Sequence, residues 1–313
     1  MSIPLLIILI VVGVFVLLFL LPTWLLSGKL YRKLLVRQSP DKWARQCSFP
    51  DDEEYCRMFE EALAWDERYR DRMRPLSVES DGLKLQAQYY DFGADRAVII
   101  IPGRTEGCLY SCYFAEPYRA AGWNVLAIDN RAHGLSEGKY PTLGKRECYD
   151  LLAWGRLLHE RCGVKKVVLH GVCIGASAAL NALTLPECPD YMAGMTADGM
   201  YTTFCDSFKA HMDEDHHPNF PITYEVMGHI LLYAGSNVVT DGPIYRIGRL
   251  KKPILFLHSR EDRFSLPEKA QLLYDSCSAP KTLHFFPRGA HSRIRIHAPE
   301  EYDACIAEFL KTV

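Results

Sequence analysis

The sequence has almost no net charge, so it lacks the excess of basic residues that is typical of a nucleic-acid-binding protein. Its 36 lysine and arginine residues are balanced by 38 aspartate and glutamate residues, leaving a formal net charge of -2. Because nucleic-acid binding relies on clustered basic residues that neutralise phosphates, we expect no nucleic-acid partner. The sequence also contains no internal repeat and no low-complexity tract. With 313 residues, 49% of them hydrophobic, it has the composition of one large globular domain with an appendage.

Cysteine pairs at short, regular spacings are missing as well. The eleven cysteines are scattered and odd in number, and they lack the paired spacing of a zinc ribbon. We expect most of them to be buried, reduced thiols, which suits a reducing compartment. The stretch from His211 to His217 (HMDEDHH) is rich in donor atoms but matches no closed metal site, and we interpret it as a solvated face. We expect neither a metal nor another cofactor.

Charged side chains are absent from one long stretch near the N-terminus. Residues 4–26 read PLLIILIVVGVFVLLFLLPTWLL, which at about 1.5 Å per residue is long enough to cross a hydrocarbon core of roughly 30 Å. Trp24 falls where an interfacial aromatic anchor is expected. The alternative, a cleaved signal peptide, is less favoured, because no Lys or Arg precedes the run and no small-x-small cleavage site follows it cleanly. The pattern predicts a single transmembrane helix.

Basic residues follow this apolar run, whereas only the α-amino group precedes it. By the positive-inside rule they predict a cytoplasmic position for the rest of the chain; they are Lys29, Arg32, Lys33, Arg37, Lys42 and Arg45. We therefore divide the chain into a transmembrane anchor (1–27), a basic juxtamembrane segment with an amphipathic helix (28–75) and a catalytic domain (76–313). The amphipathic helix is expected over 51–72, with Pro75 ending it.

Beyond residue 75, apolar runs alternate with helical patterns, which is typical of an α/β protein with a mostly parallel sheet. Eight strands are predicted, the first two joined as a hairpin at Asp81-Gly82 and the last six buried and parallel: 76–79, 83–90, 97–101, 124–129, 166–170, 192–198, 253–258 and 282–286. Helices are expected over 110–121, 145–162 (stopped by Gly163), 174–185, 267–276 and 299–311.

The segment of about 202–250 is longer than a crossover needs, so we expect a small helical cap there. Its apolar residues are expected either to line a substrate pocket or to form the core of the cap; they are Phe220, Tyr224, Met227, Ile230, Leu231, Leu232 and Tyr233.

Cys173 lies at the junction of a predicted strand and a predicted helix. The predicted strand 166–170 runs directly into Gly171-Val172-Cys173-Ile174-Gly175 and then into a helical pattern. The two glycines let strand and helix approach, while Cys173 is held strained and exposed at a helix N-terminus, where a reactive thiolate is favoured. A lone cysteine is more often a small core residue, but this setting favours a nucleophile.

From about Leu76 to the C-terminus the chain resembles the α/β-hydrolase superfamily, whose elbow motif is G-x-S-x-G. Cysteine at the nucleophile position resembles dienelactone hydrolases and polyhydroxyalkanoate synthases. The other motifs resemble lysophospholipase-like and monoacylglycerol-lipase-like members, among them D-N-R-A-H-G-L-S (129–136), which is similar to D-x-R-G-H-G-x-S and which we interpret as structural.

The resemblance also implies the partners of Cys173. Gly289-Ala290-His291 is similar to the family's G-x-H and assigns the general base to His291; His258-Ser259-Arg260-Glu261-Asp262 resembles H-G-x-x-D and assigns the acid to Asp262, with Asp198 as the alternative acid. The loop Ile101-Pro102-Gly103-Arg104 is similar to the H-G-x oxyanion loop, which implies that the backbone N–H groups of Arg104 and Ile174 form the oxyanion hole.

Together these features predict a membrane-anchored hydrolase that cleaves an ester, thioester or related acyl bond through a Cys173–His291–Asp262 triad and a thioacyl intermediate. The expected partners are a small, lipid-like acyl substrate and the membrane. Two alternatives stay open: an acyltransferase that uses the same intermediate, and a non-catalytic binding protein that keeps the fold.

Overall fold

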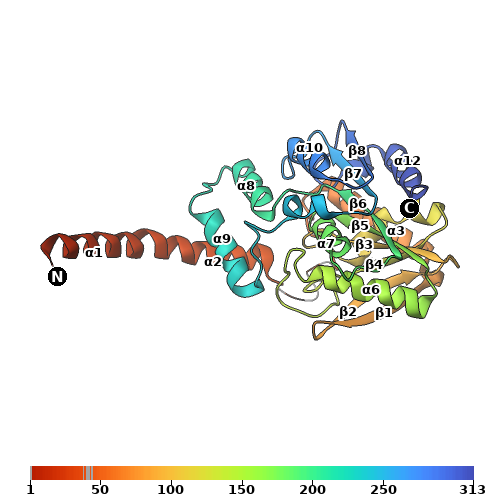
Figure 1. Ribbon diagram of the computed structural model, residues 1–313, viewed down its shortest axis with the longest axis horizontal. Coiled ribbons are helices and arrows are strands. Elements are labelled where there is room, and N and C mark those ends of the chain that lie inside the picture. The colour runs from red at the N-terminus through yellow and green to blue at the C-terminus, as the bar shows by residue number, and fades with distance from the viewer. Residues whose placement is uncertain (1, 38, 40–42, 44) are drawn as a thin grey trace.

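A long N-terminal helix and a helix-flanked sheet make up the computed structural model, which describes residues 2–37, 39, 43 and 45–313 (Figure 1). The helix begins as α1 (Ile3–Phe15), continues through a π-helical stretch (Val16–Leu20) and ends as α2 (Leu21–Leu35). It projects away from the sheet, and α1 has no buried residue. By length and composition, Ile3–Leu35 is a candidate membrane span, although a signal sequence has the same properties. Lys42, one of the basic residues behind the predicted orientation, lies outside the described residues.

The sheet has eight strands in the order β1-β2-β4-β3-β5-β6-β7-β8. They are β1 (Met73–Ser80), β2 (Leu83–Tyr90), β3 (Arg96–Ile101), β4 (Asn124–Ile128), β5 (Lys166–Val172), β6 (Met192–Asp198), β7 (Ile254–Ser259) and β8 (Lys281–Phe286). Strand β2 pairs antiparallel with both β1 and β4, and β3 to β8 are all parallel to one another. The predicted fold class is therefore confirmed.

Helices cover both faces of the sheet. On one face lie α6 (Glu147–Cys162), α7 (Ile174–Leu183) and α10 (Pro267–Ser276). On the other lie α3 (Glu53–Arg68), α4 (Cys108–Ser111), α5 (Glu116–Ala120), α11 (Ile294–His297) and α12 (Pro299–Leu310). Gly163 ends α6 in the left-handed conformation, with φ of 70°, as the sequence predicted. Each face carries its own buried apolar cluster, so the carboxyl ends of the parallel strands are held on a rigid support.

Three details of the predicted elements are wrong. Pro75 does not end a helix: α3 stops at Arg68, and Pro75 lies within β1, where an edge strand tolerates a missing N–H. The single helix expected over 110–121 is broken into α4, a 3-10 turn and α5, because Pro117 begins a new helix. Strand β8 is not buried throughout, because it lies at the other edge of the sheet.

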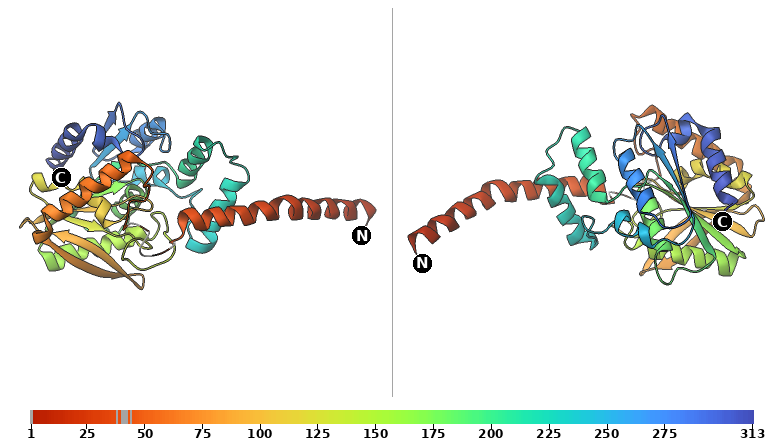
Figure 2. Two further views of the ribbon diagram at one scale, coloured as in Figure 1. Left: turned by 180° about the vertical axis from the view of Figure 1, so that it is seen from behind. Right: turned by 45° about the horizontal axis from the view of Figure 1, so that its top comes forward.

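The predicted helical cap is built from α8 (Phe204–Glu214) and α9 (Ile222–Ala234), which lie beside α2 (Figures 1 and 2). Helix α9 packs along α2, where the rings of Trp24 and His229 are 4.0 Å apart. Met227 and Ile230 are buried in the cap core, whereas the other apolar residues named for a pocket lining are exposed; these are Phe220, Tyr224, Leu231, Leu232 and Tyr233. The pocket-lining interpretation is therefore wrong for α9, because its packing partners are α2 and α8.

Candidate active site

Cys173 sits in the turn between β5 and α7, with φ of 52° and ψ of -109°. A positive φ is uncommon for a residue with a Cβ and marks local backbone strain. The neighbouring glycines explain how the turn closes: a Cβ on Gly171 would lie 2.4 Å from the backbone of Ala176, and one on Gly175 would lie 2.2 Å from the carbonyl oxygen of Ile101. Strand β5, helix α7 and strand β3 thus approach more closely than side chains would allow.

His291 and Asp262 come together beside this turn. Nδ1 of His291 lies 2.8 Å from Oδ2 of Asp262, and the carboxylate is buried. The second oxygen of Asp262 accepts hydrogen bonds from the backbone N–H groups of Phe264 (2.9 Å) and Ser265 (2.8 Å). These bonds fix the carboxylate, which in turn orients the imidazole ring.

The two side chains form a charge-coupled pair. Burial by itself lowers the pKa of His291, but the charges of Asp262 and Cys173 and the hydrogen bonds to them outweigh it, so the pKa is raised well above its usual value. Burial raises the pKa of Asp262, and the charge of His291 more than offsets this, so the pKa is lowered. Because Nδ1 faces Asp262, the ring interacts with Cys173 through Nε2, which is buried, has no other hydrogen-bond partner among the described residues, and can exchange a proton with Cys173 or a substrate.

Asp198, the alternative acid, is also close but is held differently. Its carboxylate accepts a hydrogen bond from the Tyr302 hydroxyl at 2.8 Å, and burial raises its pKa to about 7. Its backbone carbonyl accepts the N–H of Cys173 at 2.9 Å. Asp198 therefore supports the turn, while the hydrogen-bonded carboxylate of His291 is Asp262.

The loop after β3 carries the predicted oxyanion donors. Neither the N–H of Arg104 nor that of Ile174 donates a hydrogen bond in the described part of the chain, so both are free to bind a developing oxyanion. The loop is tied down around them: Nη1 of Arg104 donates to the carbonyl of Leu34 at the end of α2 (3.0 Å), and the N–H of Thr105 lies 3.3 Å from Nε2 of His133.

Glu106 is a buried acid of this loop that the sequence motifs do not identify. One carboxylate oxygen accepts the N–H of Gly103 at 2.8 Å, and the other accepts the hydroxyl of Tyr55 at 3.0 Å. Burial raises the pKa of Glu106 to about 7. Because it binds the residue next to Arg104, Glu106 sets the position of an expected oxyanion donor.

The segment 129–136 has supporting contacts, in line with its structural interpretation. Asp129 accepts the N–H groups of Cys108 and Leu135, both at 2.8 Å. Arg131 pairs with the buried carboxylate of Asp150 at 2.6 Å. These contacts, with that of His133, brace the loop that carries Arg104.

A pocket of about 300 Å³ opens over Cys173 and His291. Several residues that line this pocket lie outside the predicted motifs. Among them are Phe49, Tyr55, Ser207, His211, Phe264 and Arg293. His211 of α8 stacks on Phe264 with ring centres 3.8 Å apart, and burial lowers its pKa to about 4. The donor-rich stretch 211–217 thus begins with a residue of the pocket, and the amphipathic helix α3 contributes Tyr55.

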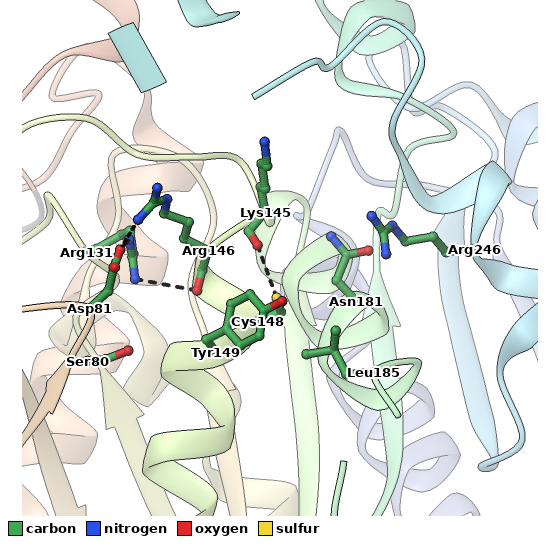
Figure 3. A pocket seen from close by; sticks show the side chains of 10 residues that line it. All are labelled: Ser80, Asp81, Arg131, Lys145, Arg146, Cys148, Tyr149, Asn181, Leu185 and Arg246. Atoms are coloured by element: carbon green, nitrogen blue, oxygen red, sulfur yellow. Dashed lines mark hydrogen bonds and ion pairs between the residues drawn. The ribbon is translucent and has the colours of Figure 1, made fainter. Parts of the chain in front are cut away.

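A larger concavity of about 520 Å³ lies elsewhere, around Arg131, Arg146 and Arg246 (Figure 3). Arg146 pairs with Asp81, and Arg246 pairs with Asp241 at 3.0 Å. Since its three guanidinium groups are already bound to carboxylates, we do not assign a ligand to this concavity. Among the residues that the structure describes, no group of three or more His, Cys, Asp or Glu side chains could hold a metal ion.

Known proteins share this arrangement of strands and helices. No family model matches the chain. An uncharacterized protein of Bacillus subtilis (strain 168), YqkD, is 27% identical over 215 residues, which cover 68% of this chain and 70% of that protein. The name of that protein states no activity.

Solved structures give the fold. The esterase Pf2001 of Pyrococcus furiosus matches with a TM-score of 0.66 and 24% identity, covering 79% of this chain and 93% of the esterase. The esterase EaEST of Exiguobacterium antarcticum matches with a TM-score of 0.57 and 14% identity, covering 75% and 98%. A serine hydrolase of Cycloclasticus zankles matches with a TM-score of 0.56 and 15% identity, covering 76% and 98%. The chain has the α/β-hydrolase fold, as its elbow motif predicted; the finer likeness to lysophospholipases and monoacylglycerol lipases stays a prediction.

Proposed function

We propose that the chain is a membrane-anchored hydrolase of ester, thioester or related acyl bonds, with Cys173 as nucleophile, His291 as base and Asp262 as orienting acid. The observation that carries the proposal is the buried His291–Asp262 pair at 2.8 Å beside a cysteine held at φ of 52°. Backbone strain at a partly buried thiol in a pocket and a raised histidine pKa next to it are features of covalent catalysis.

The reaction follows from this geometry. Because the pKa of His291 is raised, its Nε2 holds the proton of the Cys173 thiol, and Sγ attacks the acyl carbonyl carbon as a thiolate. The oxyanion is held by the N–H groups of Arg104 and Ile174. When the tetrahedral intermediate collapses, the leaving group takes the proton from His291 and a thioester with Cys173 is left. A water molecule, deprotonated by His291, then attacks the thioester, and Cys173 leaves as the acid product is released.

The fold neighbours support the hydrolase part of the proposal, since two of them are named esterases and a third a serine hydrolase. The cysteine in the serine position favours a thioester intermediate in this chain. The apolar pocket lining, with Phe49, Phe264 and Tyr110, favours a substrate with an apolar acyl group.

The anchor part of the proposal rests on Ile3–Leu35, with residues 1–27 in or at the bilayer and the basic residues that follow it on the cytoplasmic side. Segment 28–75 then connects the anchor to the hydrolase domain 76–313 and contributes α3 to it. A membrane position would bring the enzyme close to lipid-like acyl substrates.

The test uses the full chain in detergent micelles or nanodiscs, with p-nitrophenyl esters and acyl thioesters as substrates. We expect Cys173→Ala to reduce hydrolysis to the background rate, while the matched control Cys305→Ala keeps wild-type activity. Hydrolysis that survives Cys173→Ala would remove Cys173 from the mechanism. Transfer of the acyl group to an added alcohol or amine in place of water would make the protein an acyltransferase. An enzyme inert to all donors, with Cys173 also inert to iodoacetamide, would favour a binding protein.

A further inference from the structure

Helix α9 and Phe220, two residues before it, expose an apolar surface that the active site does not use. The exposed fractions are 72% for Phe220, 46% for Tyr224, 52% for Leu231 and 65% for Leu232. Tyr224 and Leu231 are two helical turns apart and so share one face, and Leu232 lies beside them. Large apolar side chains gathered on one surface mark an interaction site more often than an ordinary solvent face.

The position of α9 indicates what this surface contacts. Oγ1 of Thr23 donates to Oε1 of Glu225 at 2.7 Å, and the rings of Tyr31 and Tyr233 are 5.7 Å apart. The start of α9 (Glu225) contacts the start of α2 (Thr23), and the end of α9 (Tyr233) contacts α2 further along (Tyr31). The chain therefore runs in the same direction along both helices. The first turn of α9 lies beside the end of the apolar run, and its last turn lies toward the domain.

The two helices fit closely enough to form one surface. A Cβ on Gly228 would lie 3.2 Å from the ring of Trp24, so the glycine lets the ring lie on the backbone of α9. Beside Trp24, α2 exposes Leu21, Leu25 and Leu26 by 44%, 58% and 58%. The first half of α9 thus packs on the part of α2 that carries these exposed leucines.

The charges near this surface also match a membrane boundary. Glu225 is the one acidic residue of α9, and Thr23 already binds its carboxylate. Basic residues begin at Lys29, after the apolar run ends, and continue with Arg32 and Lys33. Aromatic and aliphatic side chains at the level of the headgroups, followed by lysine and arginine, are typical of helices that lie in the interface of a bilayer.

We propose that the start of α9 lies in the interface of the same bilayer that α1 crosses, with Phe220 and Tyr224 among the lipid acyl chains and Leu231 and Leu232 at the level of the headgroups. The inference rests on the membrane anchor of the proposed function and adds a second membrane contact to it. Helix α8 joins this contact to the active site, since Ser207 and His211 of α8 line the pocket over Cys173. The bilayer thereby holds the cap of the pocket, and the favoured substrate is an amphiphile that reaches Cys173 from the lipid.

The test measures fluorescence quenching by lipids with brominated acyl chains. The full chain is reconstituted in phosphatidylcholine vesicles as wild type, Phe220→Trp or the control Tyr245→Trp; Tyr245 is also 55% exposed but lies outside α9. We expect the emission added by Phe220→Trp to fall by at least half in brominated lipid and that added by Tyr245→Trp to stay unchanged.

Extraction with alkaline carbonate runs beside this measurement and separates two kinds of failure. If the chain is extracted from the vesicles, the anchor and the interfacial contact are both wrong. If the chain resists extraction and Phe220→Trp is quenched no more than Tyr245→Trp, the anchor stands and the interfacial position of α9 is wrong. Cross-linking of two chains through this unquenched face would assign it to a second copy instead of lipid.

A second variant tests whether the membrane contact of α9 affects catalysis. Replacing Leu231 and Leu232 together by glutamine should lower the rate on a bilayer-embedded ester several-fold and leave the rate on a short, water-soluble ester unchanged. Leu272→Gln, which removes an exposed leucine (45%) from α10, should change neither rate. An equal fall on both substrates, or on neither, would contradict delivery of the substrate from the lipid.

Discussion

Substitution of Glu106 by glutamine tests whether the oxyanion loop holds a carboxyl group that resists ionisation. The pKa of Glu106 rises from 4.5 to about 7 on folding because the group is buried. Between these two pH values the folded chain binds more protons at this site than the unfolded chain, so stability falls as pH rises. With about 1.4 kcal/mol per pKa unit, the penalty grows by about 2.5 kcal/mol between pH 5 and pH 8.

Glu106→Gln removes this penalty and keeps the shape. The amide oxygen can accept the N–H of Gly103, and the amide nitrogen can donate to the hydroxyl oxygen of Tyr55, so neither partner is left unpaired. We expect the free energy of unfolding, measured with urea in micelles at pH 5 and pH 8, to fall by about 2.5 kcal/mol less in the variant than in the wild type.

Asp198, whose pKa is also raised to about 7 by burial, contributes to the slope in both proteins and cancels in the difference. Glu268→Gln, on the exposed surface of α10, controls for the loss of a negative charge. Equal pH dependence in Glu106→Gln and wild type would refute the argument that Glu106 is held neutral by burial.

Two further substitutions test the elbow and the acid. Gly175→Ala places a Cβ 2.2 Å from the carbonyl oxygen of Ile101 and should cost about 1–3 kcal/mol and most of the activity. A Cβ at Gly155 would meet side-chain atoms alone, of Met192 at 3.2 Å and of Tyr191 at 3.6 Å, so Gly155→Ala should be mild. Equal urea midpoints for the two variants would contradict the close approach. Asp262→Asn should lower kcat by a hundred- to about ten-thousand-fold, the upper figure being the loss known for the corresponding change in a Ser-His-Asp triad, and Asp198→Asn far less; the reverse order would make Asp198 the acid.

The sheet and the meeting of Asp262 with His291 were predictable from local patterns in the sequence. A buried strand followed by two glycines around Cys173 defines the elbow, and Asp262 and His291 follow two later strands at the same edge of the sheet. Parallel strands bring these positions together whatever the loops do. The structure accordingly places Asp262 and His291 within 2.8 Å, although they are 29 residues apart in the chain.

Features that depend on packing between distant segments were not predictable. Helix α3 was expected to connect membrane and domain, yet its Tyr55 reaches Glu106 because the helix packs on the sheet. The exposed residues of α9 have the same composition as a pocket lining, and only the contact with α2 shows which way they face. The residue type alone does not distinguish a side chain in a pocket from one on a surface.

The measurement that tests the central claim most directly is intact-mass spectrometry of the full chain after rapid mixing with activated acyl donors, followed by peptide mapping. We predict one added acyl group on Cys173, formed and lost at rates that account for turnover, and none on Cys173→Ala. A wild-type enzyme that turns over without an acyl group on Cys173, or an equal adduct elsewhere in Cys173→Ala, would contradict the account.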